Sequence, residues 1–301
     1  MPLCAVPSIV ELGARSYPNS YKYKNDYILQ HGQEISTLII GGSRPYYAID
    51  AKRIDSATFN LANVAEPLTM DYWLLKRHID KLISLQTVIC EINDVNVAQH
   101  LITEDVYNSN RTTYYCRYMH YPAPSVIDNL EISHFNSARS KGIQAFLKTM
   151  NNKNDEEVLS CDRQGWGKDY RTPKGDNGEH LTRSARGEAS KFKKYPASNY
   201  SLNLEALEKI VQLCQSRGIR LIIVTMPLSR QYRDMAEPAK FELMSRAAKH
   251  LVESFGVEYK NYMADPRFDG ADFYDADHLS HQGAGKITKI ICDDFQLTLS
   301  E

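Results

Sequence analysis

Short apolar runs alternate with longer amphipathic stretches along most of this chain, and this alternation restricts the fold more than any other feature of the sequence. Strands that are nearly all apolar and alternate with helices are typical of a parallel sheet covered on both faces. We therefore expect an α/β fold, a three-layer α/β/α sandwich with a mostly parallel central sheet. The predicted strands are 37–41, 57–62, 87–92, 219–225 and 257–262, and the predicted helices are 19–35, 69–84, 136–150, 203–217, 238–255 and 281–296.

One long polar segment interrupts the alternation. Residues 151–201 are mixed in charge and rich in Gly, Ser and Lys, and we expect them to be an insertion that offers no core. Trp166 is the apolar anchor inside it, and it either pins the insertion to the body or helps to roof a pocket. We expect residues 1–34 to be an N-terminal helical extension and residues 35–301 to be a single α/β domain that carries this insertion.

The charge balance and the cysteines argue against several classes of protein. The 36 Lys and Arg nearly balance the 37 Asp and Glu, whereas a nucleic-acid binder usually shows a basic face. Six scattered cysteines form no C-x-x-C pair, which disfavours zinc and favours a reducing compartment. No apolar run is long enough to span a membrane and no signal peptide is recognisable, so we expect a cytoplasmic protein. A lost upstream anchor would instead place it at the cell envelope.

A glycine pair and a serine follow the first predicted strand. Gly41, Gly42 and Ser43 come directly after the apolar run, at the edge of the sheet where sites of open α/β folds lie. The three residues are either a tight turn without chemistry or a turn that presents Ser43 as a nucleophile. Deciding between them requires a partner base.

The candidate base lies in an acidic stretch before the last predicted helix. Asp275 precedes His278 by three residues, a spacing at which a carboxylate reaches one imidazole nitrogen and leaves the other free to take a proton. Asp277 or Ser280 acting as a helix cap would explain only part of this stretch. His281 is the alternative base. Without H-E-x-x-H or a second cluster at ligand spacing, we expect no metal site.

The order of these motifs resembles the SGNH/GDSL hydrolase superfamily. Its members have an early serine after the first strand and a D-x-x-H block near the C-terminus, as Ser43, Asp275 and His278 are arranged here. The segments at 221–232 and 278–288 look similar to a bacterial branch that modifies cell-surface polysaccharides. The resemblance covers most of 35–297 outside the insertion, and it implies the flavodoxin-like sandwich of that superfamily. The G-x-S-x-G elbow of α/β-hydrolases is not matched.

The resemblance also implies roles for individual residues. Ser43 would attack an ester, His278 would carry its proton, and Asp275 would orient the imidazole. Ala65 stands near the place of an oxyanion-hole glycine, and Asn93, in Glu91-Ile92-Asn93-Asp94, stands where the family has the asparagine of G-x-N-D. The family glycine is missing at both places. Arg44 either binds a substrate anion or pairs with a nearby Asp, the interpretation we favour.

Three functions remain open from the sequence. The first is a serine esterase that acts on O-acyl esters of a small molecule or glycan, without a cofactor. The second is a polysaccharide O-acyltransferase of the same fold, and the third is an inactive relative that binds glycan or protein. A dinucleotide enzyme is disfavoured because no G-x-G-x-x-G follows the first predicted strand.

Overall fold

The computed structural model describes residues 19–99, 114–122, 160–170, 177–193 and 195–300. These fall into two compact units. Residues 19–27, 114–122 and 160 belong to one unit, and the other described residues form the unit that contains the sheet. The helix expected at 136–150 lies outside the described residues, and the domain boundary expected at residue 34 stays a prediction.

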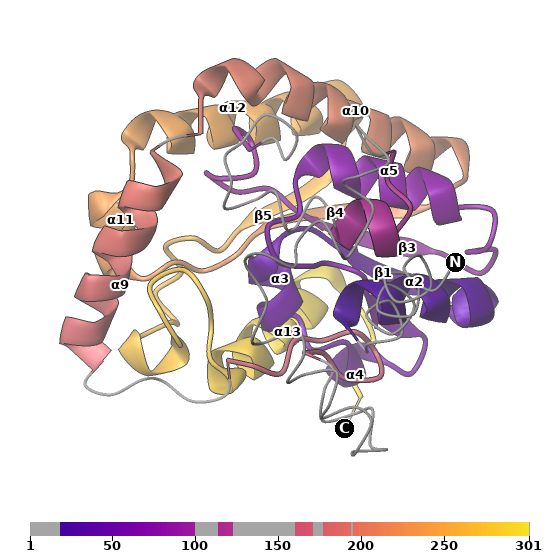
Figure 1. Ribbon diagram of the computed structural model, residues 1–301, viewed down its shortest axis with the longest axis horizontal. Coiled ribbons are helices and arrows are strands. Elements are labelled where there is room, and N and C mark those ends of the chain that lie inside the picture. The colour runs from indigo at the N-terminus through magenta and orange to yellow at the C-terminus, as the bar shows by residue number, and fades with distance from the viewer. Residues whose placement is uncertain (1–18, 100–113, 123–159, 171–176, 194, 301) are drawn as a thin grey trace, which may run out of the picture. The chain divides into compact units, whose positions relative to one another are not determined.

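The sheet has five parallel strands in the order β2-β1-β3-β4-β5 (Figure 1). Their bounds lie within two residues of those predicted from the apolar runs, which confirms the mostly parallel sheet. The two edge strands depart from the nearly all-apolar pattern: β2 is Thr-Phe-Asn, and β5 carries polar residues that are partly or fully exposed. The strands are β1 (Thr37–Ile40), β2 (Thr58–Asn60), β3 (Thr87–Glu91), β4 (Arg220–Thr225) and β5 (Glu258–Asn261).

Helices cover both faces of the sheet, as the three-layer expectation requires. Ile39, Ile89 and Ile222 are aligned across β1, β3 and β4, and they share one buried cluster with residues of α4 and α13. Helices α5, α10 and α12 form the layer on the opposite face (Figure 1). The helices of this unit include α3 (Ser43–Ala48), α4 (Ala51–Ile54), α5 (Leu68–His78), α9 (Asn177–Phe192), α10 (Tyr200–Ser216), α11 (Arg230–Met235), α12 (Pro238–Phe255) and α13 (His281–Phe295).

The remaining described elements are short or lie at the edge of this unit. Helix α2 (Ser20–His31) belongs partly to each unit. The 3-10 turns are η2 (Gly32–Glu34), η5 (Ala197–Asn199) and η6 (Gly270–Asp272). None of the helices in the described ranges is both long enough and apolar enough to cross a bilayer.

Two sequence expectations were wrong in detail. Helix α5 ends at His78 and the chain then continues in turns, with the Lys81 N–H donating to the His78 carbonyl. The insertion does contribute to the core, because α9 buries Leu181 and Ala185. The few apolar residues of α9 recur every four positions. This pattern was not apparent from the sequence, because the segment as a whole is polar.

The strand order explains where a site can form. Strand β1 has β2 on one side and β3 on the other. The chain therefore passes from β1 to β2 on one side and then returns across β1 to β3 on the other. The carboxyl ends of β1 and β3 therefore form a topological switch point, where open α/β sheets place their ligands. Ser43 follows β1 at this point, and Asn93 and Asp94 follow β3.

Candidate active site

Ser43 is presented by a turn that only glycine can make. Gly41 has a φ of +135°, and a Cβ placed on it would lie 2.7 Å from Pro45 Cγ. Ser43 is the first residue of α3, so its N–H has no acceptor within that helix. The glycines therefore make the tight turn that both interpretations of this segment require, and the turn leaves the half-buried Ser43 at the switch point.

The loop that carries Asp275 and His278 is held by its own backbone. The Tyr274 N–H donates to the His278 carbonyl, and Asp275 Oδ1 accepts the N–H groups of Asp277 and His278. Ser280 ends the loop as the N-cap of α13, which confirms one of the two expected caps. These contacts are local to the loop, and they fix the Asp275 carboxylate and the imidazole relative to each other.

Helix α9 of the insertion braces this loop from outside. Ser184 Oγ accepts the Ala276 N–H at 3.2 Å, and His180 Nε2 lies 3.2 Å from the Tyr274 carbonyl oxygen. Ala185 and Ala276 belong to one buried cluster. The polar segment that the sequence analysis treated as an excursion thus supports the candidate site.

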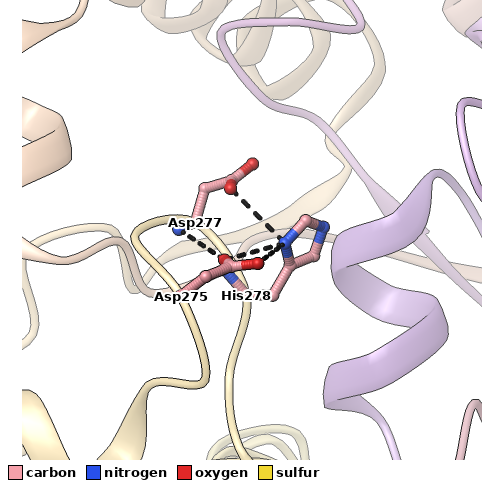
Figure 2. Close-up of side chains that lie close together, drawn as sticks. All are labelled: Asp275, Asp277 and His278. Atoms are coloured by element: carbon pink, nitrogen blue, oxygen red, sulfur yellow. Dashed lines mark hydrogen bonds and ion pairs between the residues drawn. The ribbon is translucent and has the colours of Figure 1, made fainter. Parts of the chain in front are cut away.

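Ser43, His278 and Asp275 form a hydrogen-bonded relay. His278 Nε2 lies 2.8 Å from Ser43 Oγ, and Nδ1 lies 2.9 Å and 3.1 Å from the two Asp275 carboxylate oxygens. In Figure 2 both aspartates lie on the Nδ1 side of the imidazole, and the other ring nitrogen points towards the neighbouring helix. This geometry can pass a proton between a hydroxyl and an imidazole whose second nitrogen is held by a carboxylate.

Electrostatics favour the charged form of His278. Burial lowers the pKa of the imidazole, but the charges of Asp275 and Asp277 outweigh it and raise the pKa to about 9. Burial also disfavours the Asp275 carboxylate, yet the imidazolium and the hydrogen bonds that it accepts hold its pKa below the usual value. The pair is thus most stable as an ion pair at neutral pH.

Arg44, next to the nucleophile, is buried in ion pairs. Its Nη1 donates to Asp94 Oδ1 at 2.7 Å, and its Nη2 lies 3.5 Å from Asp277 Oδ2. The Tyr232 hydroxyl donates to the other Asp94 oxygen at 2.7 Å. This is the pairing interpretation that the sequence analysis favoured.

The two oxyanion candidates have well-defined surroundings. Ala65 has a φ of +57°, the left-handed region that its family glycine would occupy at no cost, and its carbonyl accepts Gln99 Nε2 at 3.1 Å. Asn93 Oδ1 accepts the N–H groups of Val95 and Asn96, which directs the amide nitrogen away from that turn. The oxyanion roles of Ala65 and Asn93 stay predictions.

Glu91 is a buried acid that the sequence analysis did not single out. It ends β3, is fully buried, and its carboxylate lies within 4 Å of the place where a Cβ on Gly42 would be. Burial raises its pKa to about 7, although Arg44 and the Asn93 side chain act in the opposite direction. Its position in an apolar strand concealed it, since only the tertiary structure brings it beneath the glycine turn.

Trp166 pins its own segment of the insertion to the body. Its indole N–H donates to the Tyr47 carbonyl at 2.9 Å, and the Gly167 N–H donates to the Tyr46 carbonyl. Its ring lies against His281, with centroids 4.4 Å apart. His278, rather than the alternative base His281, is the histidine that meets Ser43.

An aromatic stack borders the imidazole. Tyr170 is stacked between Tyr47 and Tyr274, with ring centroids 3.9 Å and 4.2 Å away, and the edge-on distance from Tyr170 to the His278 ring is 5.0 Å. Tyr170 was not predicted from the sequence, because nothing in the local sequence distinguishes it from other tyrosines of the insertion. Tyr47 and Tyr170 of this stack both meet the imidazole edge-on.

Asp275, Asp277 and His278 are also close enough to share a metal ion. In the described structure, however, both imidazole nitrogens already have partners, Asp275 at Nδ1 and Ser43 at Nε2. A metal ligand would have to give up one of these two hydrogen bonds. The donor set therefore fits the relay better than a metal centre.

Comparisons with known proteins add a likeness of fold. No family model matches the chain, and no curated protein matches it. Solved acylhydrolase structures are similar to it. They include a candidate acylhydrolase from Bacteroides fragilis, with 9% identity, a TM-score of 0.45, and coverage of 90% of this chain and 94% of the other. A GDSL-like lipase from Bacteroides thetaiotaomicron has 8% identity and a TM-score of 0.44, with 92% and 98% covered.

A third similar structure is the lipase/acylhydrolase from Enterococcus faecalis, with 10% identity, a TM-score of 0.43, and 89% and 100% of the two chains covered. At such identities no residue role in this chain follows from them. The expected relation to the branch that modifies cell-surface polysaccharides stays a prediction.

Proposed function

We propose that this protein is a serine ester hydrolase of the SGNH/GDSL type, which cleaves O-acyl esters of a small molecule or carbohydrate. The observation that carries the proposal is the continuous relay from Ser43 Oγ through His278 to Asp275, with contacts of 2.8 Å and 2.9 Å. A serine, a histidine and an aspartate in this order of contacts are the parts that acyl transfer needs.

The first half of the reaction forms an acyl-enzyme. Ser43 Oγ bonds to the ester carbonyl carbon while its proton passes to His278 Nε2, and Asp275 stabilises the imidazolium. The tetrahedral intermediate then loses the alcohol, which takes the proton from Nε2. The N–H groups of Ser43 and Ala65 and the Asn93 amide are the proposed donors to the oxyanion, each worth about 2.7–4 kcal/mol of transition-state stabilisation.

The second half releases the acid. Water gives a proton to His278 Nε2 and bonds to the acyl carbon, and the intermediate then breaks the bond to Ser43 Oγ, which recovers its proton. If a sugar hydroxyl replaces water in this step, the same residues carry out O-acyl transfer. The acceptor, rather than the triad, distinguishes the two reactions.

Hydrolysis of p-nitrophenyl acetate, combined with labelling by a fluorophosphonate and mass mapping of the adduct, tests the proposal. We expect turnover by the wild type, loss of turnover in Ser43→Ala, and an adduct on Ser43. Ser56→Ala, at an exposed position, is the matched control and should behave as the wild type does. Equal turnover in Ser43→Ala, with no label on Ser43, would refute the esterase and leave the inactive binding relative.

A third outcome identifies a transferase. One equivalent of p-nitrophenol released per protein, followed by a stall that an added sugar hydroxyl relieves, would replace hydrolysis by O-acyl transfer.

A further inference from the structure

The candidate histidine faces a second carboxylate besides Asp275. Asp277 Oδ1 lies 3.4 Å from His278 Nδ1, and the Asp277 side chain is only 2% exposed. Nδ1 carries one proton, which the closer Asp275 accepts, so Asp277 Oδ1 has no hydrogen-bond partner among the described residues. A buried carboxylate in this position acts on the ring through its charge.

A buried negative charge needs compensation to remain in place. Arg44 Nη2 lies 3.5 Å from Asp277 Oδ2, and the same guanidinium donates to Asp94. The Tyr232 ring lies 5.4 Å below the guanidinium carbon, and its hydroxyl holds the second Asp94 oxygen. Arg44 has little freedom to leave Asp277, because its other partners hold it from two elements. Asp94 follows β3, and Tyr232 lies on α11.

We infer that Asp277 is a second carboxylate partner of His278 and is held in place by Arg44. Asp277 sets the pH range in which the imidazole is neutral, and it can substitute in part for Asp275. The catalytic meaning of this inference rests on the proposed function, but the charge relationship itself does not. Asp277 and Arg44 are positioning residues, because neither reaches the nucleophile oxygen.

Other groups around the imidazole do not supply the same effect. Glu91 comes from β3 and has a pKa of about 7, so it is only partly charged near neutrality. Burial raises the pKa of the Asp277 carboxyl to about 6, and repulsion from Asp275 and, to a smaller extent, from Glu188 on α9 adds to this effect. Other titratable or charged groups that contact the imidazole, its partners or its loop include Asp275, Arg44, Asp94, Tyr47, Tyr170, His180, Tyr232 and Tyr274.

Nuclear magnetic resonance titration of the full chain labelled with ¹⁵N-histidine tests the inference without needing ester turnover. His278→Gln assigns the resonance. We expect His278 in the wild type to titrate well above 7, and Asp277→Asn to lower its pKa by about one unit or more, the size of effect that a charge at this distance has. Asp277→Glu keeps the charge and should keep most of the shift. Asp293→Asn, an exposed aspartate on α13, is the matched control and should leave His278 unchanged.

The outcomes are separable. A His278 pKa near 6.5 in the wild type, or one that Asp277→Asn leaves within about 0.2 units, overturns the inference. Should Asp277→Asn fail to fold, Asp277→Ser, which also removes the charge, takes its place under the same criterion. The expected titration in a protein that hydrolyses no ester would sustain the charge relationship and refute only the proposed function. Ester turnover by a protein in which the His278 pKa is not shifted would sustain the proposed function and refute the charge relationship.

Discussion

His278 Nε2 lies 2.8 Å from Ser43 Oγ, although the two residues are 235 positions apart in the chain. The parallel sheet brings them together, because Ser43 follows the inner strand β1 and the loop before α13 returns to the same edge. Each partner is fixed separately, Ser43 by the glycine turn and His278 by the Asp275 loop. The proposed reaction depends on these two local structures meeting.

Replacement of Asp275 should reveal the second carboxylate. In Asp275→Asn the imidazole keeps a buried carboxylate at 3.4 Å, so we expect kcat for p-nitrophenyl acetate to fall about 10²-fold, rather than the roughly 10⁴-fold seen where one carboxylate acts alone. Asp275→Asn/Asp277→Asn should reach the larger loss. Steady-state kinetics of both single variants and the double variant, with circular dichroism to verify folding, measure the coupling. A single Asp275→Asn variant as slow as the double one would show that Asp277 gives no support.

Activity should depend on pH above neutrality. The imidazole must be neutral to accept the Ser43 proton, and the carboxylates raise its pKa to about 9. We therefore expect kcat/KM to rise from pH 6 towards pH 9 and to be lost as the pH falls through the His278 pKa. A pH series with p-nitrophenyl acetate, corrected for the spontaneous hydrolysis measured with Ser43→Ala, gives the profile. A plateau already reached at pH 7 would contradict the raised pKa.

Glu91 should destabilise the folded protein at alkaline pH. Its pKa rises from 4.5 to about 7 on folding, so between these values the folded state holds a proton that the unfolded chain has lost. The free energy of unfolding therefore falls as the pH rises through this window. Glu91→Gln should be more stable than the wild type at pH 8, by up to about 3 kcal/mol, and similar to it at pH 4.5.

Urea unfolding at both pH values measures this difference. Glu253→Gln is the matched control, since the Glu253 side chain is 63% exposed and its replacement should change stability little at either pH. Equal stabilities of Glu91→Gln and the wild type at pH 8 would show that the carboxyl is compensated in its charged form.

The two glycines before Ser43 should tolerate substitution very differently. Gly41→Ala combines a φ of +135° with a Cβ 2.7 Å from Pro45, and we expect it to cost about 2 kcal/mol or more of stability. Gly42→Ala is its matched control, because Gly42 has a φ of −78° and its nearest contacts, at 3.6 Å and 4.0 Å, are ordinary. Thermal unfolding of both variants gives the comparison. Similar losses of stability in the two would contradict the steric reason for the turn.

Much of the fold and part of the site could be predicted from the sequence, since the relevant interactions are local. The apolar runs define the strands, and the spacing of Asp275 and His278 places both groups in one short loop that its own backbone hydrogen bonds close. Ser43 could be proposed as a nucleophile because glycines follow a core strand. The polar composition of the insertion was misleading, since the packing of α9 depends on a few small residues rather than on its average character.

The sequence by itself determined which segments become strands and helices, the glycine turn and the Asp275–His278 pair, because each depends on residues a few positions apart. Only the tertiary structure decided what surrounds them. Arg44 reaches Asp94 and Asp277 because three segments converge at the switch point, and Glu91 is buried because the turn after β1 covers it. The charge of a side chain is visible in sequence, but its burial and its partners depend on which distant segments pack against it. The pKa of His278 therefore follows from tertiary structure.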